Sequence, residues 1–198
     1  MGELYKNKYR ITSARRPNWD YGSHGLYFVT ICTKDRVRYF GEIVEDEIQG
    51  IVSLRGTVEF AKGETQGVVS LRGTDIGKIA YDNWFKISDY HPYVQLDEFV
   101  VMPDHIHGIL FINKPDKMDW QAGKFGTQKN NLASIIRGYK SSVKQYAAIN
   151  NIDFQWQPKY YDRVIRDERE YLNIKEYIYN NVDNWFSSKD NFENLCLP

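Results

Sequence analysis

Two histidines separated by a single residue are the part of the sequence best suited to chemistry. His105 and His107 lie within Val100–Ile112, a run rich in strand-forming apolar residues. Because successive side chains of a strand point to opposite faces, both imidazoles emerge on one face, while Ile106 and Gly108 point to the other. Two neutral imidazoles side by side can hold one divalent metal ion. A His-x-His pair also arises by chance in ordinary strands, so the remainder of the chain must decide between these interpretations.

The hydrophobic pattern predicts the strands and helices that position these histidines. Strands are expected at Leu26–Thr33, Tyr93–Met102 and His105–Asn113, the last two joined by a tight Pro103-Asp104 turn. The first strand is apolar on both faces, which is typical of the centre of a sheet. Helices are expected from an N-cap at Asp75 to about Asp89, from Leu132 to Tyr146, and from about Asp167 to about Trp185.

The last predicted helix carries an apolar stripe and, beside it, a polar one. The apolar stripe must face the sheet and consists of Tyr171, Ile174, Ile178, Val182 and Trp185. On the neighbouring stripe, Tyr177 and Asn181 are four residues apart and therefore adjacent. A tyrosine there is compatible with an ordinary boundary residue whose hydroxyl is in water.

Together with the histidines, this polar stripe favours a catalytic interpretation. Two imidazoles and an amide oxygen would form a partly open, three-ligand site for Mg²⁺ or Mn²⁺. A phenol one helical turn from the third ligand could attack a phosphodiester held by the cation.

Composition indicates one domain spanning residues 1–198 with no overall charge. Because 26 Lys and Arg balance 26 Asp and Glu, any polyanion site must be local. Cys32 and Cys196 form no disulfide framework, which favours a reducing compartment. No apolar run approaches the length of a membrane span, and the polar start Met1–Lys6 is not a signal peptide. We therefore expect a cytoplasmic protein with no membrane partner.

A short internal repeat interrupts the predicted fold. Gly50–Thr57 and Gly67–Thr74 are nearly identical, and two copies are too few to form a solenoid. The segment from about Ile48 to Thr74 is therefore predicted to be a duplicated, hairpin-like insertion, which a surface loop tolerates at small entropic cost.

Four motifs in order resemble those of the REP-associated tyrosine transposases, which belong to the single-tyrosine HUH (His-hydrophobic-His) transposases. The motifs are Phe28–Thr33, Val101–Gly108, Trp156–Arg166 and Glu176–Asn181. The resemblance runs from about Leu26 to Trp185, apart from the insertion. It implies an α+β fold, a ferredoxin-like antiparallel sheet backed by helices.

The resemblance also assigns the site residues. His105 and His107 match the metal-binding pair, Tyr177 matches the nucleophile, and Asn181 takes the place of the third ligand. The family usually has proline after this asparagine, whereas Val182 follows here, so the helix is expected to run on.

The implied activity is nicking and rejoining of single-stranded DNA beside a hairpin, through a covalent 5′-phosphotyrosine and with Mg²⁺ or Mn²⁺. Both a homodimer and a monomer are compatible with the sequence. Two alternatives remain open: a catalytically inactive binder of hairpin DNA or RNA, and a metal-dependent hydrolase that uses water. The hydrolase is less favoured because the His-x-His motif itself contains no carboxylate to act as general base. Candidate phosphate contacts are the basic residues Arg36, Lys140, Lys159, Arg163 and Arg166.

Overall fold

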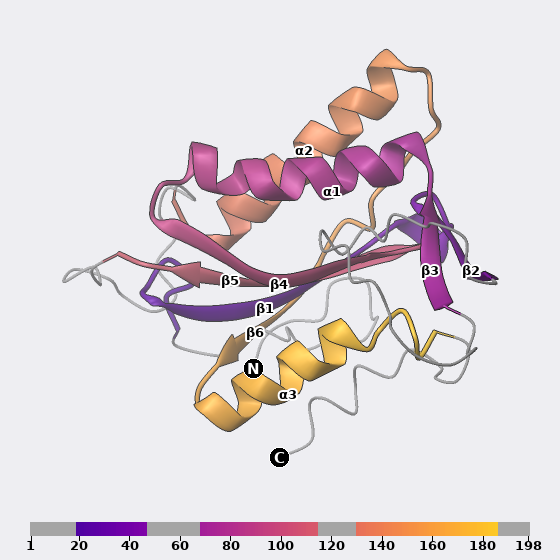
Figure 1. Ribbon diagram of the computed structural model, residues 1–198. Coiled ribbons are helices and arrows are strands. Elements are labelled where there is room, and N and C mark those ends of the chain that lie inside the picture. The colour runs from indigo at the N-terminus through magenta and orange to yellow at the C-terminus, as the bar shows by residue number, and fades with distance from the viewer. Residues whose placement is uncertain (1–18, 47–67, 115–129, 186–198) are drawn as a thin grey trace, which may run out of the picture.

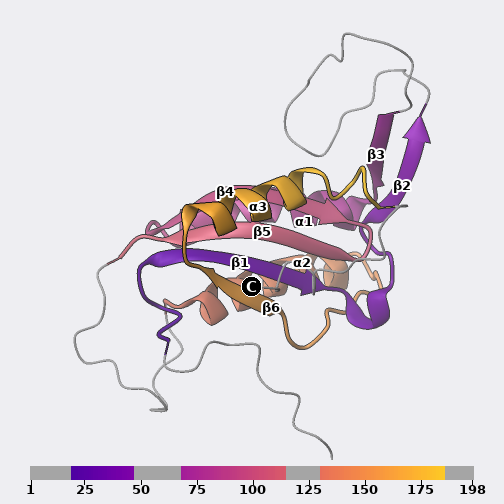
Figure 2. The same ribbon diagram turned by 90° about the horizontal axis from the view of Figure 1, so that it is seen from below.

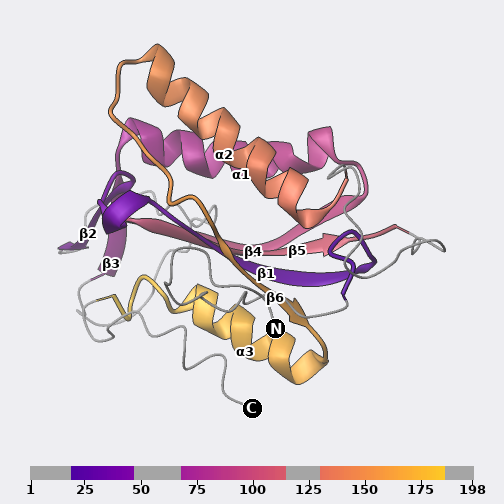
Figure 3. The same ribbon diagram turned by 180° about the vertical axis from the view of Figure 1, so that it is seen from behind.

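An antiparallel four-stranded sheet forms the middle layer of the computed structural model, which describes residues 19–46, 68–114 and 130–185. Helices α1 and α2 cover one face of the sheet, and α3 covers the other (Figures 1 and 3). In chain order the elements are β1 (Gly25–Cys32), the short 3-10 helix η2 (Lys34–Arg36), β2 (Gly41–Asp46), β3 (Val68–Gly73), α1 (Asp75–Tyr90), β4 (Val94–Met102), β5 (His105–Ile112), α2 (Leu132–Ile149), β6 (Tyr161–Ile165) and α3 (Glu168–Tyr179).

The strand order β4-β5-β1-β6 confirms the predicted fold class. Without the β2–β3 hairpin, the chain follows the ferredoxin-like sequence β1-α1-β4-β5-α2-β6, and α3 follows it. The predicted central strand is β1, which pairs antiparallel with both β5 and β6. Its residues Tyr27, Phe28, Val29 and Ile31 are almost completely buried, because helices cover both faces of the sheet.

Close packing of β5 against α1 holds the first helical layer. A Cβ atom on Gly108 would lie only 2.3 Å from Cζ2 of Trp84, so this position admits only glycine. The Trp84 indole stacks on Phe99 of β4, with ring centroids 5.4 Å apart and planes 9° apart. On α2, the Tyr139 hydroxyl donates a hydrogen bond to the Ala80 carbonyl at 2.8 Å. These contacts fix α1 and α2 on the face opposite the histidines.

The first and last helices begin or end at residues other than those predicted. The N-cap of α1 is Thr74, one residue before the predicted Asp75, because the Thr74 hydroxyl accepts the Gly77 N–H at 3.1 Å. The prediction that the last helix continues to about Trp185 was wrong, since α3 ends at Tyr179. The chain then continues in turns, and the Asn181 N–H donates to Ile178 O at 3.3 Å. Two consecutive asparagines favour this ending because their amides compete with helical hydrogen bonding.

The β2–β3 hairpin projects away from one end of the main sheet (Figure 2). The second repeat copy supplies β3, which pairs with β2 in a continuous antiparallel register. The hairpin therefore starts before Ile48, where the insertion was expected to begin. The first repeat copy, Gly50–Thr57, lies outside the described residues, as do residues 1–18 and Cys196. Within the described ranges, no helix is long and apolar enough to cross a membrane.

Candidate active site

Two imidazoles and a phenol meet on the α3 face of the sheet. His105 Nε2 lies 3.0 Å from His107 Nε2, which in turn lies 3.1 Å from the Tyr177 hydroxyl. Both histidines are completely buried, whereas Tyr177 is partly exposed. The predicted strand alternation places the imidazoles on one face, and the predicted polar stripe of α3 brings the tyrosine over them. Residues 70 positions apart along the chain thus share one hydrogen bond.

Each imidazole is oriented through its other ring nitrogen. His105 Nδ1 lies 2.6 Å from a carboxylate oxygen of Asp104, which can only accept when ionised, so Nδ1 donates. In neutral His105 this leaves a lone pair on Nε2, the arrangement found where a carboxylate orients a metal-binding histidine. His107 Nδ1 is 2.8 Å from the Thr30 hydroxyl, and its ring stacks on Phe28 at 5.5 Å. The Nε2 atoms are therefore held facing a common point.

Asp104 is itself held in place by the end of β1 and the loop after it. Its second carboxylate oxygen lies 3.0 Å from Arg36 Nε, and its carbonyl accepts hydrogen bonds from the Thr33 N–H and hydroxyl, both at 2.9 Å. Since Asp104 is engaged by both His105 and Arg36, it is a positioning residue rather than an available general base. Sequence reasoning missed Asp104 and Thr30. A carboxylate directly before the first histidine was the one available signal for Asp104.

Burial keeps His107 neutral. Desolvation lowers the pKa of His107 well below its ordinary value, and electrostatic interaction with His105 and with the positive charge of Arg36 lowers this pKa further. A neutral imidazole is the form that can bind a metal ion.

The described residues fit a divalent cation only if an amide serves as third ligand. Within the described ranges, no group of three or more His, Cys, Asp or Glu side chains could hold a metal ion. Two nitrogens bound about 2.1 Å from an octahedral cation are about 3.0 Å apart, which matches the separation of the Nε2 atoms. Asn181 is buried, and its Oδ1 atom has no hydrogen-bond partner. A buried hydrogen-bond acceptor without a partner lowers the stability of the folded protein unless it binds a ligand.

A polar clamp holds α3 on β4. The Tyr171 hydroxyl donates to Asp97 at 2.6 Å, and Lys175 Nζ lies 3.1 Å from the other oxygen of this carboxylate. Burial raises the pKa of Asp97, but the bonds from Tyr171 and Lys175 outweigh it and hold this pKa below its ordinary value. Below the clamp, Ile174 and Ile178 are buried against the sheet, as the apolar stripe predicted. The clamp and this stripe together place Tyr177 over His107.

The five predicted phosphate contacts lie in different surroundings. Arg36 pairs with Asp104, while Arg163 and Arg166 both pair with Glu170. Lys140 donates to the Gln157 carbonyl, and desolvation lowers the pKa of its ammonium. Lys159 is exposed. The assignment of these residues to DNA stays a prediction.

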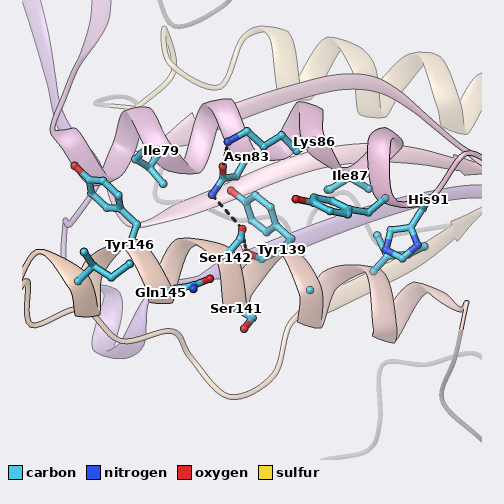
Figure 4. Close-up of a pocket in the computed structure, with 14 residues that line it drawn as sticks. Ile79, Asn83, Lys86, Ile87, His91, Tyr139, Ser141, Ser142, Gln145 and Tyr146 are labelled. Carbon is cyan, nitrogen blue, oxygen red and sulfur yellow. Dashed lines mark hydrogen bonds between the residues drawn. The ribbon is translucent and has the colours of Figure 1, made fainter.

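A separate hollow of about 570 Å³ lies between α1 and α2, on the other side of the sheet from the histidines (Figure 4). Its walls are largely apolar and include Ile79, Ile87 and Ile135. The amide of Asn83 donates to the Ser142 hydroxyl at 3.1 Å. This hollow offers no cluster of reactive groups comparable to the histidines and Tyr177.

The fold is that of the HUH transposases. A solved structure of the REP-associated tyrosine transposase bound to a REP hairpin superposes with a TM-score of 0.51, at 17% sequence identity, and covers 90% of this chain and 77% of that one. No family model matches the chain.

A sequence relative is an uncharacterized protein of Haemophilus influenzae. It is 34% identical over 183 residues, which cover 87% of this chain and 88% of that protein. The chain belongs to the same family as this Haemophilus protein.

Proposed function

We propose that the protein is a single-tyrosine HUH transposase that nicks and rejoins single-stranded DNA next to a hairpin. The observation that carries this proposal is the contact between the Tyr177 hydroxyl and His107 Nε2, which itself faces His105 Nε2 at 3.0 Å. A nucleophile beside a pair of potential metal ligands is the arrangement that phosphodiester transesterification needs.

His105, His107 and Asn181 would hold Mg²⁺ or Mn²⁺. When bound, the cation supplies polarisation of the scissile phosphate and neutralises its developing charge. Asp104 and Thr30 keep the two imidazoles in the ligating orientation through hydrogen bonds of 2.6 and 2.8 Å.

Tyr177 provides the nucleophile. Its oxygen attacks phosphorus as the phenol gives up its proton, a bond forms between phosphorus and the phenolic oxygen, and the bond to the 3′-oxygen breaks as that oxygen takes up a proton. The product is a 5′-phosphotyrosine and a free 3′-hydroxyl. Because the number of phosphate ester bonds is unchanged, a second 3′-hydroxyl can reverse the step and join ends without ATP.

We propose that a single chain supplies both the nucleophile and the pair of imidazoles. The Tyr177 hydroxyl contacts the imidazole of its own chain, and the Asp97 clamp keeps α3 there. A dimer is therefore not required for the proposed chemistry. A hydrolase that uses water is less favoured, since Asp104 is already engaged with His105 and Arg36.

The test is a covalent adduct with DNA. The protein is incubated with Mg²⁺ and end-labelled hairpin oligonucleotides that carry single-stranded flanks, and adducts are resolved on denaturing gels. We expect an adduct that disappears with chelator and with Tyr177→Phe. It should persist with Tyr179→Phe, because Tyr179 is a neighbouring tyrosine that is 53% exposed. An adduct of undiminished yield from Tyr177→Phe would remove the assignment. Hairpin binding that survives chelation, without any adduct, would support an inactive binder.

A further inference from the structure

An arginine and a tryptophan meet beside His105 and have no part in the chemistry proposed above. The Trp185 ring is nearly parallel to the His105 ring, with centroids 6.3 Å apart and planes 26° apart. The guanidinium carbon of Arg38 lies 5.5 Å from the centroid of the Trp185 ring. Trp185 is half-buried and Arg38 is exposed. An aromatic ring under an exposed cation therefore borders the proposed metal ligands.

The loop after β1 directs two arginines to the surroundings of His105. Asp35 and Arg36 adopt left-handed backbone conformations, with φ of 54° and 56°, which arginine rarely does. Val37 is extended, with φ of −66°. Arg36 pairs with Asp104, whereas Arg38, two residues further, lies over the indole. One arginine therefore supports His105, and the other remains on the surface next to it.

Arg38 differs in its partners from other arginines near α3 and the site. Within the described ranges no acidic side chain pairs with Arg38. Arg163 and Arg166 instead share Glu170. A guanidinium without an acidic partner can bind a phosphate without first breaking an ion pair.

We propose that Trp185 and Arg38 form a subsite for the unpaired nucleotide next to the scissile phosphate. The base stacks on the indole, and the nucleotide's phosphate pairs with the guanidinium. This inference rests on the proposed function. If the scissile phosphate binds at the two imidazoles, the adjacent nucleotide lies close to Trp185, because the Trp185 ring is next to the His105 ring. Stacking on aromatic rings and pairing with a nearby cation are the two contacts by which proteins hold single strands.

The test separates the base from the phosphate. Anisotropy measurements in the Tyr177→Phe background, where no adduct forms, use two short single-stranded probes of equal phosphate number, one of mixed sequence and one fully abasic. Trp185→Ala should weaken binding of the mixed-sequence probe about tenfold and leave the affinity for the abasic probe unchanged. Trp185→Phe, which keeps an aromatic ring, should retain most of the affinity for the mixed-sequence probe. Arg38→Ala should weaken the binding of both probes. It should also reduce the slope of log Kd against log salt concentration by about one.

Tyr90→Ala and Lys144→Ala serve as matched controls, since Tyr90 on α1 is 78% exposed and Lys144 on α2 is also exposed, both on helices of the other face. Neither should change the affinity for either probe. The subsite is overturned if Trp185→Ala affects both probes equally or neither, or if the parent binds neither probe. Adduct formation by the wild type reports on the proposed function separately, because base-dependent binding does not require cleavage.

Discussion

The two faces of β5 serve different purposes, although their residues alternate along one strand. On one face, Gly108 has no side chain, so the Trp84 indole packs directly against the strand backbone in the apolar layer between β5 and α1. On the other, His105 and His107 face a phenol and a carboxylate. The difference shows that one strand can contribute both a rigid support and a reactive group, because side chains at odd and even positions never share a face.

The largest effect is expected on the apolar face, from Gly108→Ala. The added Cβ would lie 2.3 Å from Trp84, whose ring is fully buried and cannot move away. We expect a loss of about 3 kcal/mol in the free energy of unfolding, measured by urea denaturation. The matched control is Gly138→Ala on α2, where a Cβ meets nothing within 4 Å. There alanine should stabilise by about 0.5–1 kcal/mol. Equal effects at the two positions would contradict the close packing.

The next effect is expected on the polar face, from Asp104→Asn. Loss of the carboxylate charge weakens the orientation of His105 and removes the ion pair with Arg36. We expect the affinity for Mn²⁺ to fall by about 10–100-fold, measured by titration calorimetry. Asp97→Asn, which lies in the clamp rather than at the imidazoles, should leave Mn²⁺ affinity unchanged. The same loss from both variants would show that Asp104 has no specific effect on the ligands.

A smaller effect is expected in the clamp, from Asp97→Asn. The substitution replaces a charged acceptor of two hydrogen bonds, so the free energy of unfolding should fall by about 1–2 kcal/mol at pH 7. The folded-state pKa of Asp97 is lowered, so its contribution is fully present above the unfolded pKa of about 3.9 and is lost as pH falls through the folded value. The difference between wild type and variant should therefore be constant near neutral pH and shrink in acid. If the difference in unfolding free energy between wild type and variant instead grows in acid, the pKa of Asp97 is raised in the folded state, not lowered.

The smallest stability effect is expected from Tyr177→Phe. Its hydroxyl lies 3.1 Å from His107 Nε2, within hydrogen-bond distance, and the ring remains beside Phe28. We expect a change below about 1 kcal/mol in the free energy of unfolding, although the variant should form no adduct. Thermal melting checks this, and a large loss of stability would mean that the missing adduct reports misfolding.

Some site residues were predictable, and others needed the folded chain. The histidine pair and the Tyr177 stripe follow from periods of two and 3.6 residues, which are local properties. The pairing of Arg163 and Arg166 with Glu170 joins β6, the loop after it and α3, and composition cannot distinguish a paired arginine from an available one. The end of α3 was also predicted wrongly. The apolar spacing continues to Trp185, whereas the helix ends at Tyr179 and the Asn181 side chain is buried.

By itself, the sequence determined the alternation of β5, the buried character of β1 and the amphipathic faces of the helices. Each depends only on the spacing of apolar side chains along a regular backbone. Tertiary structure alone decided that Tyr177 meets His107, that Arg36 pairs with Asp104, and that Arg38 lies over Trp185. These contacts join segments whose separation in space depends on strand order and helix packing, and no local pattern in the chain encodes that separation.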